Sequence, residues 1–415
     1  MTINRQIMLA ICTLAITVLL LIPSISYAAT WYFAPALSGG SDSNSGTSSS
    51  PWLTPGYHNG SYSPGDVLQL AAGTYHLSNS QLSAHGSASG GYITLQCAPN
   101  FGSIIEVTGA SGIYIGLGTS GTSGASYWDI RGCDVNATGS GSEGISVAGS
   151  NIGTGPNHHI IIEGNMVHGA ACNGIGIDGN TNVSTGGTIY PTDYITIRNN
   201  IVYGNGFTSP NNCSGISVFE PVAYDTASGN HISIIGNIVY GNNACDSCGT
   251  VTDGNGIILD DYKYSENSAF LLAYPSGYTQ QTTVRANITY NNGGKGIHVF
   301  RSQNALITAN AAWGDNQDAT ECSDSGNGGY EMDANDSSSI TYNSNTAQAF
   351  SATCGGHQTY AYGEYDIGGT ATSDVYSANT GRTVVGSNDL VGYAASPPSA
   401  YYTNESGFSW GVSNN

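Results

Sequence analysis

Positive charge is scarce in this chain. Of its 415 residues only 8 are Lys or Arg, against 28 Asp or Glu, and the formal net charge is −20 at pH 7. Nucleic acids and anionic membranes are bound through clusters of basic residues, so this balance argues against both as partners. It also means that an acidic polymer would be repelled at long range, unless a bound cation or an acidic medium offsets the charge.

Long apolar runs are missing beyond the first residues. Residues 8–22 form such a run, after the basic Arg5 and before Pro23, and the small-x-small triplet Ser26–Ala28 follows. This order of features is typical of an export signal, and the run is too short to favour a membrane anchor. We therefore expect residues 1–28 to be removed, which takes away Arg5 and shifts the formal net charge from −20 to −21. The mature protein is expected to be secreted, extracellular or periplasmic, away from the membrane and monomeric.

Helical spacing of apolar residues is absent as well. Apolar and polar residues instead alternate in pieces of about four to six residues bounded by Gly and Asn, which is the pattern of strands with one buried face. The first kind of piece has the form Gly-Ile-x-Val/Ile. Its copies begin at Gly144, Gly174, Gly215, Gly256 and Gly296, and Gly329 is interpreted as the start of a sixth copy.

A second piece, Ile-x-Ile-x-x-Asn, alternates with the first, and a third short apolar piece such as Ile201–Gly204 follows it. Three short strands per repeat without helices cannot form βαβ units, so the chain must coil, with each strand about 4.8 Å from its copy in the next turn. We predict an all-β, right-handed, single-stranded parallel β-helix. The closing asparagines are predicted to form an internal ladder: Asn165, Asn200, Asn237, Asn287, Asn310 and Asn345.

The repeats also divide the mature chain. Residues 29–108 are expected to form an N-terminal cap and the first coils, and residues 109–355 the regular coils. Residues 356–415 are expected to form C-terminal coils and a tail that packs on the helix.

Aligning the Gly-Ile-x-Val copies predicts which side chains point outward. Ionisable residues concentrate in the later four coils, which would place them on one face within about two coil spacings, or about 10 Å. Six of them, on two successive coils, form the predicted site. They are Asp260, Asp261 and Lys263 on one coil and Lys295, His298 and Arg301 on the next. A surface salt-bridge network is the structural alternative, and such pairs contribute little stability. The functional interpretation is a catalytic or binding site, with these substrate contacts: Lys263, Phe219, Phe300, Glu331 and Asp333.

The cysteines indicate disulfides. Nine are present, and the eight that remain after Cys12 leaves with the signal are an even number in an exported chain. Cys172 and Cys213 each lie two residues before a motif glycine, so stacking would bring them within bridging distance. The other expected pairs are Cys97–Cys133, Cys322–Cys354 and Cys245–Cys248.

The start of the mature chain carries a family resemblance. Trp31–Pro35, Gly40–Thr47, Pro51–Trp52 and Pro64–Tyr75 resemble the opening of exported bacterial proteins with the pectin-lyase-like β-helix, among them calcium-dependent pectate lyases that use a lysine base. The resemblance implies a polysaccharide partner and cleavage of an acidic polysaccharide by β-elimination.

The same resemblance implies roles for the predicted site. Asp260 and Asp261 look like the adjacent pair that helps to hold calcium, and Lys295 or Arg301, about one coil later, looks like the base; His298 is a further candidate base. The family has another Asp three residues after the pair, where this chain has Tyr264. The calcium site would then be completed by Glu220 or Asp178.

Two other functions fit the same residues. Polygalacturonase-type hydrolases share the fold, and Asp260, Asp261, His298 and Arg301 follow their order along the chain, although the flanking Gly-His-Gly and Arg-x-Lys motifs are missing. Two carboxyl groups across a glycosidic bond would then act as acid and base. The remaining alternative is a non-catalytic adhesion protein, in which Phe219 and Phe300 stack on sugar rings.

Overall fold

The computed structural model describes most of the chain. The described residues are 28–77, 81–107, 111–116, 124–138, 143–148, 155–179, 189–245, 248, 253–318, 329–350, 359–365, 375–377 and 379–384. The predicted export signal, the pair Cys322–Cys354 and the end of the chain after residue 384 lie outside them. No helix in the described ranges combines the length and apolarity needed to cross a membrane.

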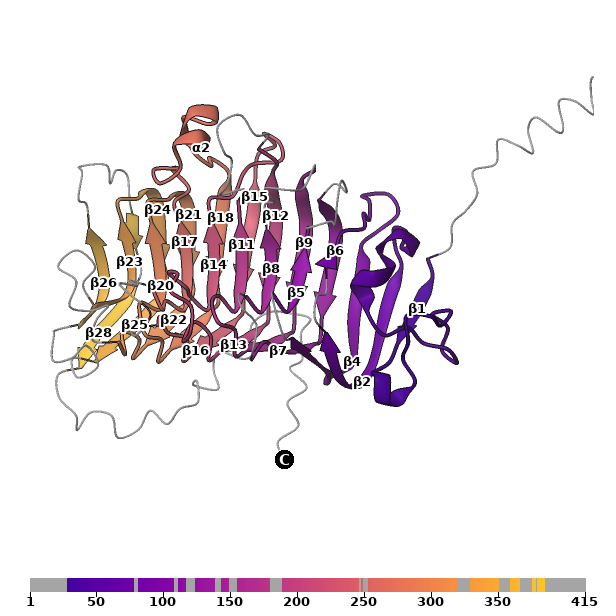
Figure 1. The fold of residues 1–415 in the computed structure, drawn as a ribbon. Coiled ribbons are helices and arrows are strands. Elements are labelled where there is room, and N and C mark those ends of the chain that lie inside the picture. The colour runs from indigo at the N-terminus through magenta and orange to yellow at the C-terminus, as the bar shows by residue number, and fades with distance from the viewer. Residues whose placement is uncertain are drawn as a thin grey trace, which may run out of the picture.

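The chain winds into a right-handed parallel β-helix with three strands in each regular coil (Figure 1). One face is a nine-stranded parallel sheet, in which each strand is followed by its copy from the next coil. Its strands are β3 (Gln81–Leu82), β5 (Ile113–Ile115), β8 (Ile145–Ala148), β11 (Ile175–Asp178), β14 (Ile216–Phe219), β17 (Ile257–Asp260), β20 (Ile297–Phe300), β23 (Gly329–Asn335) and β26 (Thr359–Tyr365).

The other two faces join into one 19-stranded sheet. The second face consists of β1 (Thr30–Phe33), β6 (Ala125–Arg131), β9 (Asn157–Glu163), β12 (Thr192–Arg198), β15 (Asn230–Ile235), β18 (Gln281–Arg285), β21 (Gln303–Thr308), β24 (Ser338–Asn343) and β27 (Val375–Ser377). The third consists of β7 (Asp134–Asn136), β10 (Met166–His168), β13 (Ile201–Tyr203), β16 (Ile238–Tyr240), β19 (Ile288–Tyr290), β22 (Ala311–Trp313), β25 (Thr346–Phe350) and β28 (Thr380–Val384). The long strands β2 (Val67–Leu77) and β4 (Ile93–Val107) pair along both faces.

The predicted register of the glycine-led copies is confirmed through the fifth copy. Ile175 pairs with Ile145 on one side and with Ile216 on the other, and the next coils continue with Ile257 and Ile297. These inward residues are fully buried. The core is thus a column of stacked aliphatic side chains, and its continuity makes each coil depend on both neighbours.

The predicted asparagine ladder is confirmed, and it extends to Asn379. In each step the side-chain oxygen of one asparagine accepts hydrogen bonds from the backbone N–H and the amide of the asparagine in the preceding coil. The amide also donates to a core carbonyl, as from Asn237 Nδ2 to Ile197 O at 3.0 Å. The ladder therefore satisfies backbone groups that the turn would leave buried and unpaired.

A second internal ladder was not predicted. It connects Asn205, Asn242 and Asn292 by the same pattern of bonds and ends at Asp315, whose Oδ1 accepts from the Asn292 N–H at 2.9 Å and from its amide at 2.7 Å. A side chain on motif glycines Gly215 or Gly256 would collide with this ladder. Glycine is therefore required there by space inside the helix.

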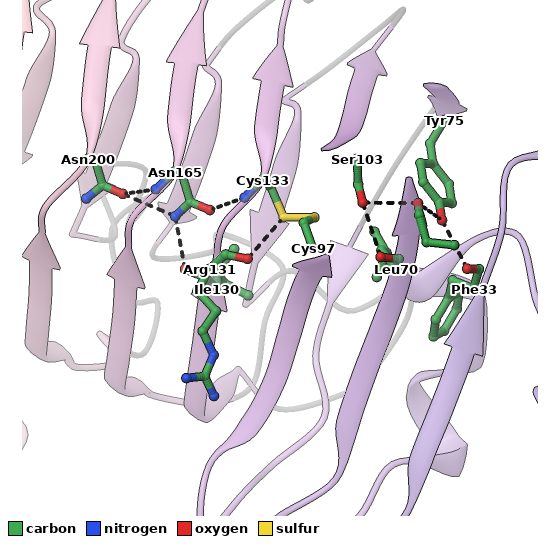
Figure 2. Close-up of a disulfide and its surroundings, with 11 residues drawn as sticks. Phe33, Leu70, Tyr75, Cys97, Ser103, Ile130, Arg131, Cys133, Asn165 and Asn200 are labelled. Carbon is green, nitrogen blue, oxygen red and sulfur yellow. Dashed lines mark hydrogen bonds between the residues drawn. A yellow bond between two sulfur atoms is a disulfide. The ribbon is translucent and has the colours of Figure 1, made fainter. Parts of the chain in front are cut away.

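Three disulfides are present among the described residues, and each was expected from the sequence: Cys97–Cys133, Cys172–Cys213 and Cys245–Cys248. The first two join successive coils. Cys133 also donates its backbone N–H to Asn165 Oδ1 at 3.0 Å, so the Cys97–Cys133 bridge lies next to the start of the asparagine ladder (Figure 2).

One long insertion interrupts the regular coils between β17 and β18. It contains the helix α2 (Ser268–Ala273), which projects from the solenoid in Figure 1. Asn267 caps this helix by accepting from the backbone N–H groups of Ala269 and Phe270, and Phe270 is fully buried. The insertion begins at the corner that carries the predicted site, so it supplies side chains to that site.

We expect Asn237→Ala to destabilise the solenoid by about 3 kcal/mol. The substitution leaves the N–H of Asn200 and the carbonyl of Ile197 buried without a partner, at about 1–3 kcal/mol per group. Urea unfolding measures the change, and the exposed Asn230→Ala is the control, expected within about 0.5 kcal/mol of the wild type. Equal effects of the two substitutions would contradict a structural role for the ladder.

Candidate functional site

The site lies on the outer face of the nine-stranded sheet, over β14, β17, β20 and β23. The outward positions of these strands stack in columns, because every strand pairs in register with its neighbours. One column contains Ile258, His298 and Asp333, and a second contains Phe219, Asp260 and Phe300. The two coils that the sequence singled out are therefore adjacent in space, as predicted.

The sixth copy of the motif is placed differently from the prediction. The sequence aligned Gly329 with the other motif glycines, but β20 pairs with β23 so that Ile297 lies opposite Met332 and His298 opposite Asp333. Glu331 thus takes the position of the motif glycine. The prediction that its side chain points outward is wrong, because the side chain is fully buried beside Asp315. The two-residue shift moves Asp333 next to His298.

His298 and Asp333 form a hydrogen-bonded pair. His298 Nδ1 and Asp333 Oδ1 are 2.5 Å apart, and the two residues are 4% and 1% exposed. Burial lowers the pKa of His298; the Asp333 carboxylate opposes this change, and the nearby Lys295 adds to it. The ring is therefore held in its neutral form around neutral pH, with Nδ1–H donated to the carboxylate. No described residue is seen to hydrogen-bond Nε2.

Lys295 lies in a row of buried polar residues that the sequence interpretation missed. The row occupies the position just before each motif glycine: Glu143, Asn173, Ser214, Asn255 and Lys295. The Lys295 backbone N–H donates to Asn255 Oδ1 at 2.9 Å. Burial raises the pKa of the nearby Asp253 to about 6, and the charge of Lys295 opposes that rise. The sequence did contain a signal for this row, since the residue before the motif glycine is polar in each of these five copies.

A row of left-handed residues forms the corner beside the site. Glu220, Asp261, Arg301 and Asp336 stack there with φ between 45° and 49°. The Asp261 carboxylate is occupied by the turn that follows it, since it accepts from Ser265 N–H at 2.8 Å, from the Ser265 hydroxyl at 2.6 Å and from Glu266 N–H at 2.7 Å. These bonds give Asp261 a structural role at the start of the insertion.

Glu220 faces Asp261 across the corner and is 1% exposed. Its Oε2 accepts from Asn267 at 3.1 Å, while Oε1 is buried and no described residue donates to it. Burial raises the pKa of Glu220 to about 8, and the Asp261 carboxylate contributes to the rise. Around neutral pH, Glu220 is therefore mostly protonated and can donate to Asp261.

Other carboxyl groups of this face share the same electrostatics. Burial raises the pKa of Asp260 well above its usual value, and the charges of Asp253 and Glu266 raise it further. Burial likewise raises the pKa of Asp178, helped by Glu143 and Glu220. The face therefore carries a set of carboxyl groups that hold protons, or would hold a cation, more readily than exposed carboxylates do.

The remaining predicted contacts border this set. Arg301 Nη1 lies 2.6 Å from Glu266 Oε1, and its guanidinium sits 4.6 Å from the centre of the Phe300 ring. Lys263 Nζ donates to the backbone carbonyl of Asp336 at 2.5 Å. Phe219 and Phe300 are both half-buried in the outward column that contains Asp260.

No family model matches the chain, and no curated protein is similar to it. Several solved structures are similar in fold. A pectate lyase, Pel9A, is 16% identical over 84% of this chain and 80% of its own, with a TM-score of 0.43. XylC in complex with xylose is 12% identical over 77% and 69%, with a TM-score of 0.48. An alginate lyase from Paenibacillus sp. is 15% identical over 85% and 99%, with a TM-score of 0.35.

We expect Glu220→Gln to flatten the pH dependence of stability. The folded pKa of about 8 lies above the unfolded value of about 4.3, so the native state binds more protons between these values and loses stability as pH rises through them. Gln keeps the acceptor for Asn267 but does not titrate. Unfolding by urea at about pH 5 and about pH 8.5 should show a loss of about 1–3 kcal/mol in the wild type and a smaller loss in the variant. An unchanged profile would contradict the protonated Glu220.

Proposed function

We propose that the protein is a secreted polysaccharide lyase that cleaves an acidic polysaccharide by β-elimination on the outer face of the nine-stranded sheet. The proposal is carried by the buried pair of His298 and Asp333 next to Lys295. Elimination from a uronate needs a base for the C5 proton, positive charge near the carboxylate, and a proton for the departing oxygen. The site has a group for each requirement.

His298 is assigned as the base. Its Nδ1–H is donated to Asp333, so the lone pair of Nε2 is available for the proton, and its lowered pKa keeps the ring neutral and able to accept one. Asp333 holds the ring orientation and stabilises the imidazolium that forms. This arrangement supports His298 over Lys295, the first candidate from the family resemblance, because only the His298 ring is oriented by a buried carboxylate partner.

Lys295 and Asp260 are assigned the other two tasks. The ammonium group of Lys295 interacts electrostatically with His298, so a uronate carboxylate bound there would have its charge balanced as the C5 proton leaves. Asp260 lies in the adjacent outward column, one coil before Phe300, and its raised pKa retains a proton for the glycosidic oxygen. Arg301 and the two phenylalanines border the path of the sugar chain.

Calcium is proposed as a cofactor at the corner. Glu220 Oε1 is buried and has no donor among the described residues, and the charge of Glu220 raises the pKa values of both Asp260 and Asp178. Such carboxyl oxygens are the ligands that Ca²⁺ prefers. Asp261 fits less well, because its oxygens accept from the turn, and no described group of three acidic, His or Cys residues has metal-site geometry. A bound calcium ion would supply positive charge for the substrate carboxylate.

Hydrolysis is the second candidate, and one observation favours it. Asp178 and Asp260 occupy the same outward column two coils apart, which corresponds to about 10 Å, and both have raised pKa values. Inverting glycosidases place their acid and base carboxyl groups at about 6.5–9.5 Å, close to this spacing. In that reaction Asp260 would protonate the leaving oxygen and Asp178 would activate water.

Activity assays on pectate, alginate and neutral glycans test these functions. With a lyase, we expect unsaturated products that absorb in the ultraviolet, and His298→Ala should lower kcat by about 10²- to 10⁴-fold. Asp333→Asn and Lys295→Ala should also reduce kcat, whereas Ser217→Ala, on an outward position two coils away from His298, should not.

The outcomes separate the alternatives. New reducing ends without ultraviolet absorbance would indicate hydrolysis and contradict the lyase proposal. Sugar binding without any product would indicate the adhesion function. Full activity of both Lys295→Ala and Arg301→Ala would show that neither cation takes part in the reaction. Full activity of His298→Ala would show that the base is misassigned.

Calcium binding has a readout that does not depend on activity. A ligand that binds only the folded state stabilises it, so millimolar Ca²⁺ should raise the thermal unfolding midpoint at about pH 8, where more of the carboxyl groups are ionised, and much less at about pH 5. Glu220→Gln should reduce the increase. A midpoint that does not respond to Ca²⁺ at either pH would rule out the proposed cofactor.

A further inference from the structure

A buried pair of acids ends the second internal ladder. Asp315 and Glu331 are both 0% exposed, and the Asp315 backbone N–H donates to Glu331 Oε2 at 3.2 Å. Each of the two carboxyl groups also affects the pKa of the other. Two carboxylates this close and this buried would repel each other strongly, so the pair requires a shared proton.

Three coordinated departures from the repeat build this pair. Asp315 replaces the ladder asparagine, Glu331 replaces the motif glycine of the next coil, and Thr289 replaces the valine of the earlier coils, such as Val239. The Thr289 hydroxyl donates to Asp315 Oδ2 at 3.1 Å. Glu331 Oε2 takes the part that the next ladder oxygen would play, accepting from the Asp315 N–H as Asp315 Oδ1 accepts from the Asn292 N–H.

The hydrogen bonds indicate which acid carries the proton. Asp315 accepts from the Asn292 backbone and amide and from Thr289, three donors that favour its ionised form. Glu331 Oε1 is buried and has no donor among the residues that the structure describes. The atom is therefore suited to be the hydroxyl of a protonated carboxyl group that donates to Asp315.

The pair is connected to the candidate site through one strand. Glu331 and Asp333 lie two residues apart in β23, and Asp333 is the partner of His298. If Glu331 ionises, its displacement from Asp315 must move β23. Asp333 would then shift relative to His298, which is held in β20.

We propose that the pair of Asp315 and Glu331 is a proton-dependent latch, which fixes β23 on β20 when protonated and thereby positions Asp333 for His298. Glu331 is a positioning residue, and the effect on catalysis rests on the proposed function, whereas the latch itself does not. Among the described residues, the groups that act on the pair are its own two members, Thr289, Asn292 and the backbone of Gly314. The charged Lys295 is next in sequence to Gly296, which lies close to Asp315 Oδ2.

The direction of the pH effect follows from burial. Burial raises the pKa of Asp315 to about 7, and it raises the pKa of Glu331 well above its usual value. The unfolded values are about 3.9 and about 4.3, so the folded state binds more protons than the unfolded state above these values. The contribution of the latch to stability is therefore present in acid and is lost as the pH rises toward about 7 and beyond.

The test compares hydrogen exchange in wild type, Glu331→Gln and Asp315→Asn between about pH 5 and about pH 9, corrected for the intrinsic pH dependence of exchange. In the wild type, we expect peptides covering β22 to β24 to lose protection by about tenfold or more as the pH rises, while those covering β9 to β12 change less. Glu331→Gln mimics the protonated acid and should keep protection at high pH. Asp315→Asn gives the same result by removing the second charge, and it replaces Glu331→Gln if that variant does not fold.

Glu220→Gln is the matched control, because it removes a carboxyl group with a raised pKa outside the latch and should leave the exchange of β22 to β24 at the wild-type level. If the wild type shows no pH dependence in β23, or if both latch variants keep it, the latch is wrong. If the latch variants behave as expected and no variant has lyase activity, the proposed function fails while the latch stands.

Discussion

The stacking of each coil on its copy determines everything else in this molecule. Parallel pairing links residues about 35–50 positions apart, and the asparagine ladder satisfies the buried turn groups that would otherwise oppose that stacking. Because one register holds along each face, a residue type at one position of the repeat becomes a row in space. The polar row before the motif glycines and the left-handed corner residues arise in this way, and so does the site.

The scarcity of positive charge shapes the chemistry of that site. Among the described residues, Lys295, Arg301 and Lys263 are the cations that accompany a larger number of carboxyl groups on this face, and burial together with the neighbouring carboxylates raises the pKa values of several of these acids. A polymer of uronates could approach such a face because protonated carboxyl groups do not repel it. The same protonation suits Asp260 for the role of acid that we propose, so the charge balance that opposes an acidic substrate at long range would favour acid catalysis at close range.

Much of the fold, and part of the site, could be predicted from the sequence, for reasons that particular residues make clear. Apolar alternation and the recurring Asn are local patterns, so the strands, the ladder and the bridge Cys172–Cys213 followed from spacing. The sixth coil could not be placed in this way, because Gly329 imitates the motif while Glu331 occupies its position. The capping bonds of Asp261 depend on the conformation of the insertion, and no repeat pattern reports that conformation.

The place where the repeat fails is also where the proposed base, His298, acquires its carboxylate partner. If Gly329 had kept the glycine position, Glu331 would have projected outward and Asp333 would have lain two residues further along, away from His298. The shift places an acid inside the helix, where a neutral glycine is otherwise required, and a buried acid is tolerated there because Asp315 shares its proton. The geometry of the outer dyad and the protonation of the inner pair are thus two consequences of one register, and a change in either is transmitted through β23 to the other.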